Sequence, residues 1–278
     1  MNRKTAVWLL IPAFLGVLVF TFFPLIQIAI PTFQSKSGFF SLYTQFLKSS
    51  FNWAVIGRSF LIAIVTVIVV LILGVPISIW IGRQKTVVRQ ILNLLILFPM
   101  LTNAVVRNFA WIIILGHDGI VNKTLLALHL IKSPLNILYT NTSIIIGSVY
   151  LFLPIMINSL IGSVAELNVE IEEAAAVLGS SPWRTLFKVI IPQLTTGILT
   201  GCILVFAGTM TAYTTPEILG GNRHLVMATL IYQQAMTLGN WQNASVISLI
   251  LIVISALSMW LMRRLSHHLD RRPINARS

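Results

Sequence analysis

Six long apolar runs decide what this chain can fold into. Each is about 20 residues long, the length that an α-helix needs to cross the hydrocarbon core of a bilayer. The runs cover about residues 8–30, 59–81, 91–115, 140–163, 195–215 and 243–262. Only 9% of the residues are charged, whereas soluble domains have about a quarter. The sequence therefore predicts an all-α integral membrane protein, with residues 1–278 forming a single transmembrane domain of six helices.

The distribution of basic residues predicts the orientation of these spans. A net charge of +12 is compatible with nucleic-acid binding, but the cations lie in short loops between spans and at the C-terminus. With both termini in the cytoplasm, 12 Lys and Arg residues lie inside and seven lie outside. This asymmetry follows the positive-inside rule. We therefore expect membrane lipids rather than nucleic acid around the chain.

No pattern in the sequence indicates an enzyme. The single cysteine, Cys202, lies within an apolar run, so neither a disulfide framework nor a cysteine metal site is available. The phosphate-binding pattern G-x-x-x-x-G-K-[ST] is absent from the sequence. His267 and His268 lack acidic partners at metal-ligand spacing. We predict no catalytic residue, no metal and no cofactor.

The most polar stretch, residues 166–192, lies between the fourth and fifth predicted spans and holds four of the seven acidic residues. We call it the acidic loop. Apolar residues at i, i+4, i+7, i+8 and i+11 give its first part the stripe of an amphipathic helix. These residues are Leu167, Ile171, Ala174, Ala175 and Leu178.

Local signals also predict where the helices of the acidic loop begin and end. Asn168 is expected to cap the start of the first helix, and Gly179 to end it with a positive φ. Ser181 and Pro182 are then the N-cap and the first residue of a second helix. Pro192 is expected to separate that helix from the fifth span. The acidic loop is therefore predicted to be a helix–turn–helix.

The same residues resemble a family motif. Glu173-Ala174-Ala175, then Gly179 after three residues and Val189-Ile190-Ile191-Pro192 after nine more, resemble the EAA loop of binding-protein-dependent ABC importer permeases. The resemblance implies that the acidic loop is cytoplasmic and docks on an ATPase subunit. The residues carried over for this coupling role are Glu173, Ala174, Ala175, Gly179 and Pro192. The alternative is an ordinary amphipathic helix lying on the membrane surface.

A second resemblance narrows the branch of that family. The run from Phe98 to Trp111, continued by residues 115–122, is similar to the third span of spermidine/putrescine-type permeases. The run from Thr214 to Gly221 is similar to the segment after their fifth span. This branch also includes importers of opines, phosphonates and ferric iron, so the solute is predicted only as a polyamine or a related small polar molecule.

The resemblance implies a non-catalytic subunit in a bacterial inner membrane, crossing it several times. Its implied partners are two copies of an ABC ATPase, a second homologous permease and a periplasmic or lipid-anchored solute-binding protein. Whether the second permease is identical to this chain stays open.

Polar residues in the outer parts of the third and fifth spans, and in the loop after the fifth, are candidates for the translocation path. They are Thr102, Asn103, Arg107, Thr211, Tyr213, Thr214 and Glu217. For Arg107 the alternative is a side chain that reaches to the outer interface. For Glu217 the alternative is a solvated carboxylate in a loop. A polyamine path would be expected to hold several carboxylates, and few are present outside the acidic loop.

The competing function is a secondary transporter or a channel that is not driven by ATP. Such proteins generally carry ionisable residues inside their spans, as ion or proton relays. The clearly central positions of the six predicted spans hold none. A self-contained transporter would also have little use for an acidic helix–turn–helix in the cytoplasm.

Overall fold

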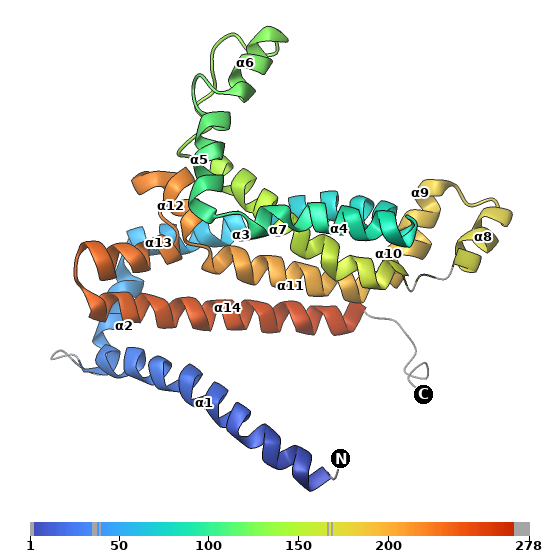
Figure 1. Cartoon of the computed structure of the whole chain (residues 1–278). Helices are drawn as coiled ribbons and strands as arrows, with labels where there is room; N and C mark the ends of the chain where they lie inside the picture. Colours follow the sequence, from blue (N-terminus) through green and yellow to red (C-terminus); the bar gives the residue numbers. More distant parts are fainter. Residues whose placement is uncertain (1–2, 35–37, 39, 166, 168, 270–278) are drawn as a thin grey trace. The chain divides into compact units, whose positions relative to one another are not determined.

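The structure is a computed structural model that describes residues 3–34, 38, 40–165, 167 and 169–269. These residues form helices joined by turns, with no strand among them (Figure 1). Two compact units can be distinguished: Met1–Ala54 with Leu230–Val253 (unit 1), and Val55–Thr229 with Ile254–Ser278 (unit 2).

The longest helices are α1 (Arg3–Phe33), α3 (Ser50–Gly82), α7 (Asn141–Ala165), α11 (Thr195–Thr211) and α14 (Trp241–Leu269). The shorter helices are α2 (Ser41–Lys48), α4 (Thr86–Leu101), α5 (Ala104–Leu115), α6 (Ile120–Ala127), α8 (Val169–Val177), α9 (Pro182–Thr185), α10 (Ile191–Gln193), α12 (Thr214–Gly220) and α13 (Met227–Tyr232).

Five helical stretches in the described part of the chain are long and apolar enough to cross a membrane. They are Phe14–Phe33, Ser50–Gly82, Ala104–Ala127, Asn141–Ala165 and Trp241–Arg264. Pro182–Gln193 and Thr195–Thr211, which meet at a bend of 73°, give a sixth if they are counted as one span. The predicted all-α membrane architecture is confirmed.

The third predicted span, residues 91–115, falls on two helices. Helix α4 ends at Leu101, Thr102 is extended, and Asn103 caps the start of α5. The side-chain oxygen of Asn103 accepts hydrogen bonds from the backbone N–H groups of Val105 and Val106. An Asn in this position satisfies N–H groups that have no partner within the helix, and it therefore favours a new start over a continuous span.

The segment after the fifth predicted span also differs from the expectation. A loop is predicted there, but Thr214–Gly220 forms helix α12, in which Pro216 and Leu219 are buried. Pro216 lies in the first turn, where a missing N–H costs no helical hydrogen bond. Helix α12 packs on α5 and α7 (Figure 1). The expected loop is thus a packed helix.

The core of unit 2 lies between α3, α7 and α11. Met156 and Leu160 of α7 are fully buried against Val70 of α3 and Val205 of α11. Close approach of α11 to α7 depends on glycine: a Cβ at Gly197 would lie 2.7 Å from Ser163 Oγ and 3.0 Å from the backbone oxygen of Ser159. Gly197 and Gly201 are four residues apart, the spacing with which small residues bring membrane helices together.

In unit 1 the end of α1 anchors α2 and the start of α14. The hydroxyl of Tyr43 donates to Thr32 Oγ1 at 2.8 Å, and Thr32 is fully buried. The side-chain nitrogen of Gln242 donates to the backbone oxygen of Pro31, also at 2.8 Å. Helix α1 itself exposes large apolar side chains, such as Phe20 at 83%, as a helix that faces lipid would.

Candidate functional site

The first helix of the acidic loop ends in the manner predicted. Helix α8 stops at Val177, and Gly179 has a φ of +77°. The N–H of Gly179 donates to the carbonyl of Ala176, and the N–H of Ser180 donates to that of Ala175. This pair of bonds is the Schellman motif, in which a residue of positive φ closes a helix. The predicted cap at the other end of α8, Asn168, lies outside the described residues.

The second half of the acidic loop begins as predicted and ends differently. Ser181 Oγ accepts from the N–H of Arg184, and Pro182 is the first residue of α9. A π-turn over Leu186–Ile190 follows, and then α10, which contains Pro192. The wider π-turn accommodates a proline, whose ring would collide with the carbonyl four residues earlier in an α-helix. The break before α11 falls at Leu194, so the prediction that Pro192 itself separates the two helices is wrong.

The outer surface of the acidic loop combines acidic and apolar side chains. Glu173 and Ala174 are exposed, and Ala175 is half-buried. Val177 and Leu178, at the tip of the turn, are 88% and 87% exposed. Across the turn, the rings of Trp183 and Phe187 stack with their centroids 6.4 Å apart, and both are exposed. The end of the hairpin therefore presents an exposed apolar surface next to its acidic side chains.

The apolar stripe predicted for the first helix of the acidic loop is only partly buried within the chain. Leu167 packs against the core cluster of unit 2, but Ile171 is 46% exposed and Leu178 is almost fully so. In Figure 1 the hairpin of α8 and α9, in yellow, lies beyond the ends of α7 and α11.

Two contacts that the sequence did not predict hold the end of α3, one to the acidic loop and one to the end of α7. The guanidinium Nη2 of Arg83 donates to Glu172 Oε2 at 2.6 Å. One residue earlier, Gly82 approaches Val164 so closely that a Cβ would collide with it. Because 89 residues separate Arg83 from Glu172, no local pattern could have paired them.

The first group of predicted path residues lies at the break between α4 and α5. Thr102 Oγ1 donates to the carbonyl of Pro99 at 2.8 Å. Arg107 Nη1 donates to the same carbonyl at 2.7 Å and to that of Thr102 at 3.5 Å. The guanidinium thus binds carbonyls at the C-terminal end of α4, where a cation is favourable.

The second group lies at the break between α11 and α12. Thr211, exposed at the end of α11, donates through its hydroxyl to the carbonyl of Ala207 at 2.9 Å. Tyr213 precedes α12, Thr214 begins it, and Glu217 lies in its first turn. The Glu217 side chain is half-buried, and its carboxylate has no hydrogen-bond partner among the described residues. The structure therefore places both groups at helix breaks. At the first, the Arg107 guanidinium is hydrogen-bonded to backbone carbonyls, and at the second, the Glu217 carboxylate has no hydrogen bond among the described residues.

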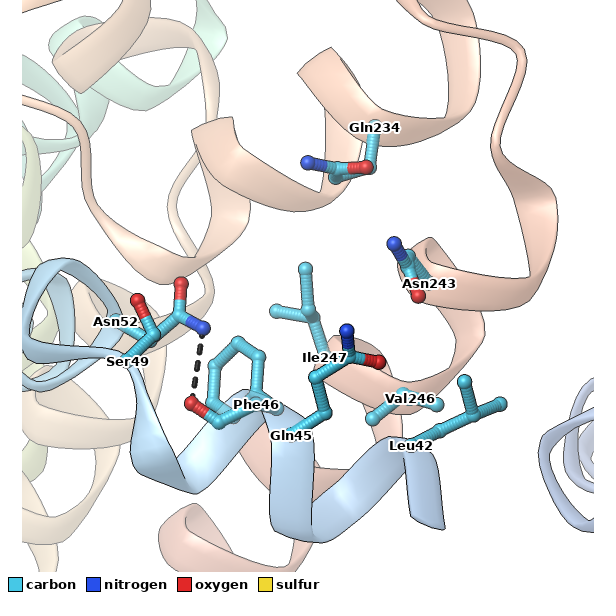
Figure 2. Close-up of a pocket in the computed structure, with 9 residues that line it drawn as sticks. All are labelled: Leu42, Gln45, Phe46, Ser49, Asn52, Gln234, Asn243, Val246 and Ile247. Atoms are coloured by element: carbon cyan, nitrogen blue, oxygen red, sulfur yellow. Dashed lines mark hydrogen bonds between the residues drawn. The ribbon is translucent and has the colours of Figure 1, made fainter. Parts of the chain in front are cut away.

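A pocket in unit 1 holds none of these residues. It has a volume of about 240 Å³ and lies between α2, the start of α3, the π-turn Gln233–Thr237 and the start of α14 (Figure 2). The amides of Gln45, Gln234 and Asn243 surround Phe46 and Ile247, and the lining carries no charge. Neutral walls give a charged solute no compensation, so this pocket does not match the predicted path.

Several helices able to cross a membrane, with a polar helical hairpin between two of them, are the features of a multi-pass membrane protein. A family model described as "Binding-protein-dependent transport system inner membrane component" matches residues 74–273. The chain belongs to this family and is a permease subunit of an ABC importer.

Curated relatives match most of the chain. It is 30% identical over 230 residues to the spermidine/putrescine transport system permease protein PotB of Escherichia coli (strain K12), covering 83% of each chain. The PotB protein of Haemophilus influenzae is 31% identical over 218 residues, covering 78% of this chain and 76% of the relative. The molybdenum transport system permease protein ModB of Mycobacterium tuberculosis (strain H37Rv) is 29% identical over 253 residues, covering 90% of each.

Solved structures share the fold. A crystal structure of a bacterial alginate ABC transporter, in complex with an alginate pentasaccharide-bound periplasmic protein, matches with a TM-score of 0.77. The match covers 98% of this chain and 96% of the other, at 13% identity. A likeness at this identity establishes the fold alone.

Proposed function

We propose that this subunit imports a polyamine or a related small cationic solute, and that the acidic loop couples it to an ATPase. The observation that carries the coupling is the exposed surface of the hairpin, where Glu173 lies beside Ala174 and near the apolar side chains at the turn. Two small residues allow a partner surface to approach closely, and Glu173 offers a charge to a basic group on it.

The proposed assembly has this chain, a second homologous permease, two copies of the ATPase and a periplasmic or lipid-anchored binding protein. Both termini and the acidic loop are in the cytoplasm. Closure of the ATPase dimer displaces the acidic loops, and the spans then alternate between outward and inward access. This chain contributes the translocation path and the loop that couples it to the ATPase, and ATP hydrolysis occurs on the ATPase subunit.

The side chains at the two helix breaks favour a cation over an oxyanion. The Arg107 guanidinium is occupied by the carbonyls of Pro99 and Thr102. The carboxylate of Glu217 has no such partner among the described residues. A path with an available carboxylate and an engaged guanidinium supports the cationic solute of the PotB relatives over the solute of ModB.

Coupling is tested with Glu173→Lys and Ala175→Trp. The first places like charges together, which commonly costs several kcal/mol at an interface, and the second blocks close approach. Both changes lie outside the spans, so membrane abundance should stay normal while the co-purified ATPase and uptake fall together. A compensating acidic substitution on the ATPase should restore part of the activity of Glu173→Lys. Normal uptake by both variants would contradict a coupling role.

The solute is tested with the complete transporter in proteoliposomes. Uptake of labelled spermidine and putrescine is compared with uptake of molybdate, each with the cognate binding protein and internal ATP. We expect ATP-dependent accumulation of the polyamine. Accumulation of molybdate alone would replace the cationic assignment with that of the ModB relatives.

A further inference from the structure

The C-terminal end of α3 has contacts at two neighbouring positions: Arg83 with the acidic loop, and Gly82 with the end of α7. Arg83 forms an ion pair of 2.6 Å with Glu172, whose side chain is only 18% exposed, while that of Arg83 is 52% exposed. Gly82 packs against Val164 near the end of α7, and Val164 is buried. Because an ion pair and a tightly packed contact lie at consecutive residues, the end of α3 can move little relative to α7 and α8.

Glu172 and Glu173 face different partners. Consecutive residues on an α-helix differ in direction by about 100°. Glu172 is therefore turned to Arg83 of the same chain, while Glu173 is exposed. Helix α8 therefore carries one carboxylate, Glu172, that binds within the chain, and an adjacent one, Glu173, that is exposed to a partner.

The choice of Arg83 among the nearby cations is specific. Lys85 lies two residues further on and is exposed, but it forms no ion pair within the described residues. A guanidinium holds a carboxylate in a defined geometry, whereas an ammonium acts as a point charge.

We propose that Arg83 is a positioning residue for energy coupling: it fixes helix α8 to α3 through Glu172. This inference rests on the proposed coupling function of the acidic loop. Helix α3 then moves with the loop, in addition to α7, which precedes the loop in the chain. The movement reaches the core directly, because Gly74 of α3 packs on Met156 of α7, with a Cβ at Gly74 only 2.7 Å from the Met156 side chain.

Folding should depend little on this pair. Half-exposed ion pairs contribute little to stability, because water solvates the separated charges well. Variants of Arg83 and Glu172 should therefore insert and assemble, and any defect should appear in the number of solutes imported per ATP hydrolysed.

The test uses the complete transporter with Arg83→Glu, Glu172→Arg and the double exchange. We expect each single variant to lower uptake per ATP about fivefold, the effect of losing one such contact at the coupling step. The double exchange should recover uptake to within about twofold of the unchanged protein. The matched control is Lys85→Glu combined with Glu172→Arg, which should stay impaired because Lys85 forms no ion pair with α8 among the described residues.

Co-purification of the ATPase separates the possible failures. If the ATPase binds every variant and the single variants transport normally, or if the Lys85 control recovers as well as the exchange, the role of Arg83 is refuted and the coupling function stands. If Glu173→Lys and Ala175→Trp retain both ATPase and uptake, the coupling function itself fails.

Discussion

At the residue scale, Gly179 is the position whose backbone conformation the acidic loop depends on. Its φ of +77° lies where side chains are unfavourable, and a Cβ added there would meet nothing within 4 Å. The cost of substitution is therefore conformational rather than steric. We expect Gly179→Val to strain the turn by about 1–3 kcal/mol and to impair uptake at normal membrane abundance. Gly179→Asn should transport nearly normally, since Asn tolerates this conformation.

Uptake and immunoblots of both variants check this prediction. Equal impairment by Val and Asn would point to a need for close approach at Gly179 rather than to its positive φ.

Glu217 is the residue on which the charge of the solute should depend. Its half-buried carboxylate lies in the first turn of α12. Glu217→Gln keeps the shape and removes the charge, and we expect spermidine uptake to fall about fivefold, which corresponds to about 1 kcal/mol. Asp118→Asn is the control, because the Asp118 side chain is 92% exposed. Uptake rates over a range of spermidine concentrations measure both, and equal effects would remove Glu217 from the path.

At the scale of elements, the packing of α11 on α7 offers a comparison between two glycines. In Gly197→Ala the new Cβ would meet Ser163 Oγ at 2.7 Å and the carbonyl of Ser159 at 3.0 Å. Overpacking of this kind costs about 1–3 kcal/mol. Gly162, on α7, has nothing within 4 Å of a Cβ, so Gly162→Ala should stabilise its helix by up to about 1 kcal/mol.

Thermal unfolding in detergent should therefore move in opposite directions for the two variants. If the Gly197→Ala protein is as stable as the Gly162→Ala protein, α11 and α7 can move apart without a loss of stability, and their close packing does not depend on Gly197.

The elements that could be predicted are those whose signals lie within a few residues. The turn at Gly179 and the start at Ser181 each depend on a residue type at the place where it acts. The cap at Asn103 is just as local, but the long apolar run around it predicts one span over residues 91–115 where the structure has two helices.

Helix α12 is not predicted by the sequence, because Pro216 and the glycines at its end, Gly220 and Gly221, are typical of a loop. Burial of Thr215, Pro216 and Leu219 against α5 and α7 outweighs the weak helix preference of the segment. The contact of Arg83 with Glu172 could not be predicted at all, because it depends on where α3 and α7 end in space. Of the predicted site, the structure describes every coupling and path residue, but their roles remain predictions.

At the scale of the whole molecule, the charge distribution and the acidic loop predict the same orientation. Twelve of the 19 basic residues lie inside if both termini are cytoplasmic, and seven lie outside. The positive-inside rule counts short loops near the spans, which is where these cations occur. An inverted chain would put the acidic loop outside, where no ATPase could reach it. The proposed coupling function therefore requires the orientation with both termini in the cytoplasm.

Cysteine labelling tests this orientation. In the Cys202→Ser background, which removes the single native thiol, Leu178→Cys reports on the acidic loop and Lys123→Cys on the segment between α5 and α7. Both positions are exposed, with Leu178 at 87%. A membrane-impermeant maleimide added to intact cells should label only Lys123→Cys, because charged reagents do not cross the hydrocarbon core. In inverted vesicles made from cells that lack the ATPase, it should label only Leu178→Cys. Labelling of Leu178→Cys in intact cells would invert the orientation and rule out docking of an ATPase on the acidic loop.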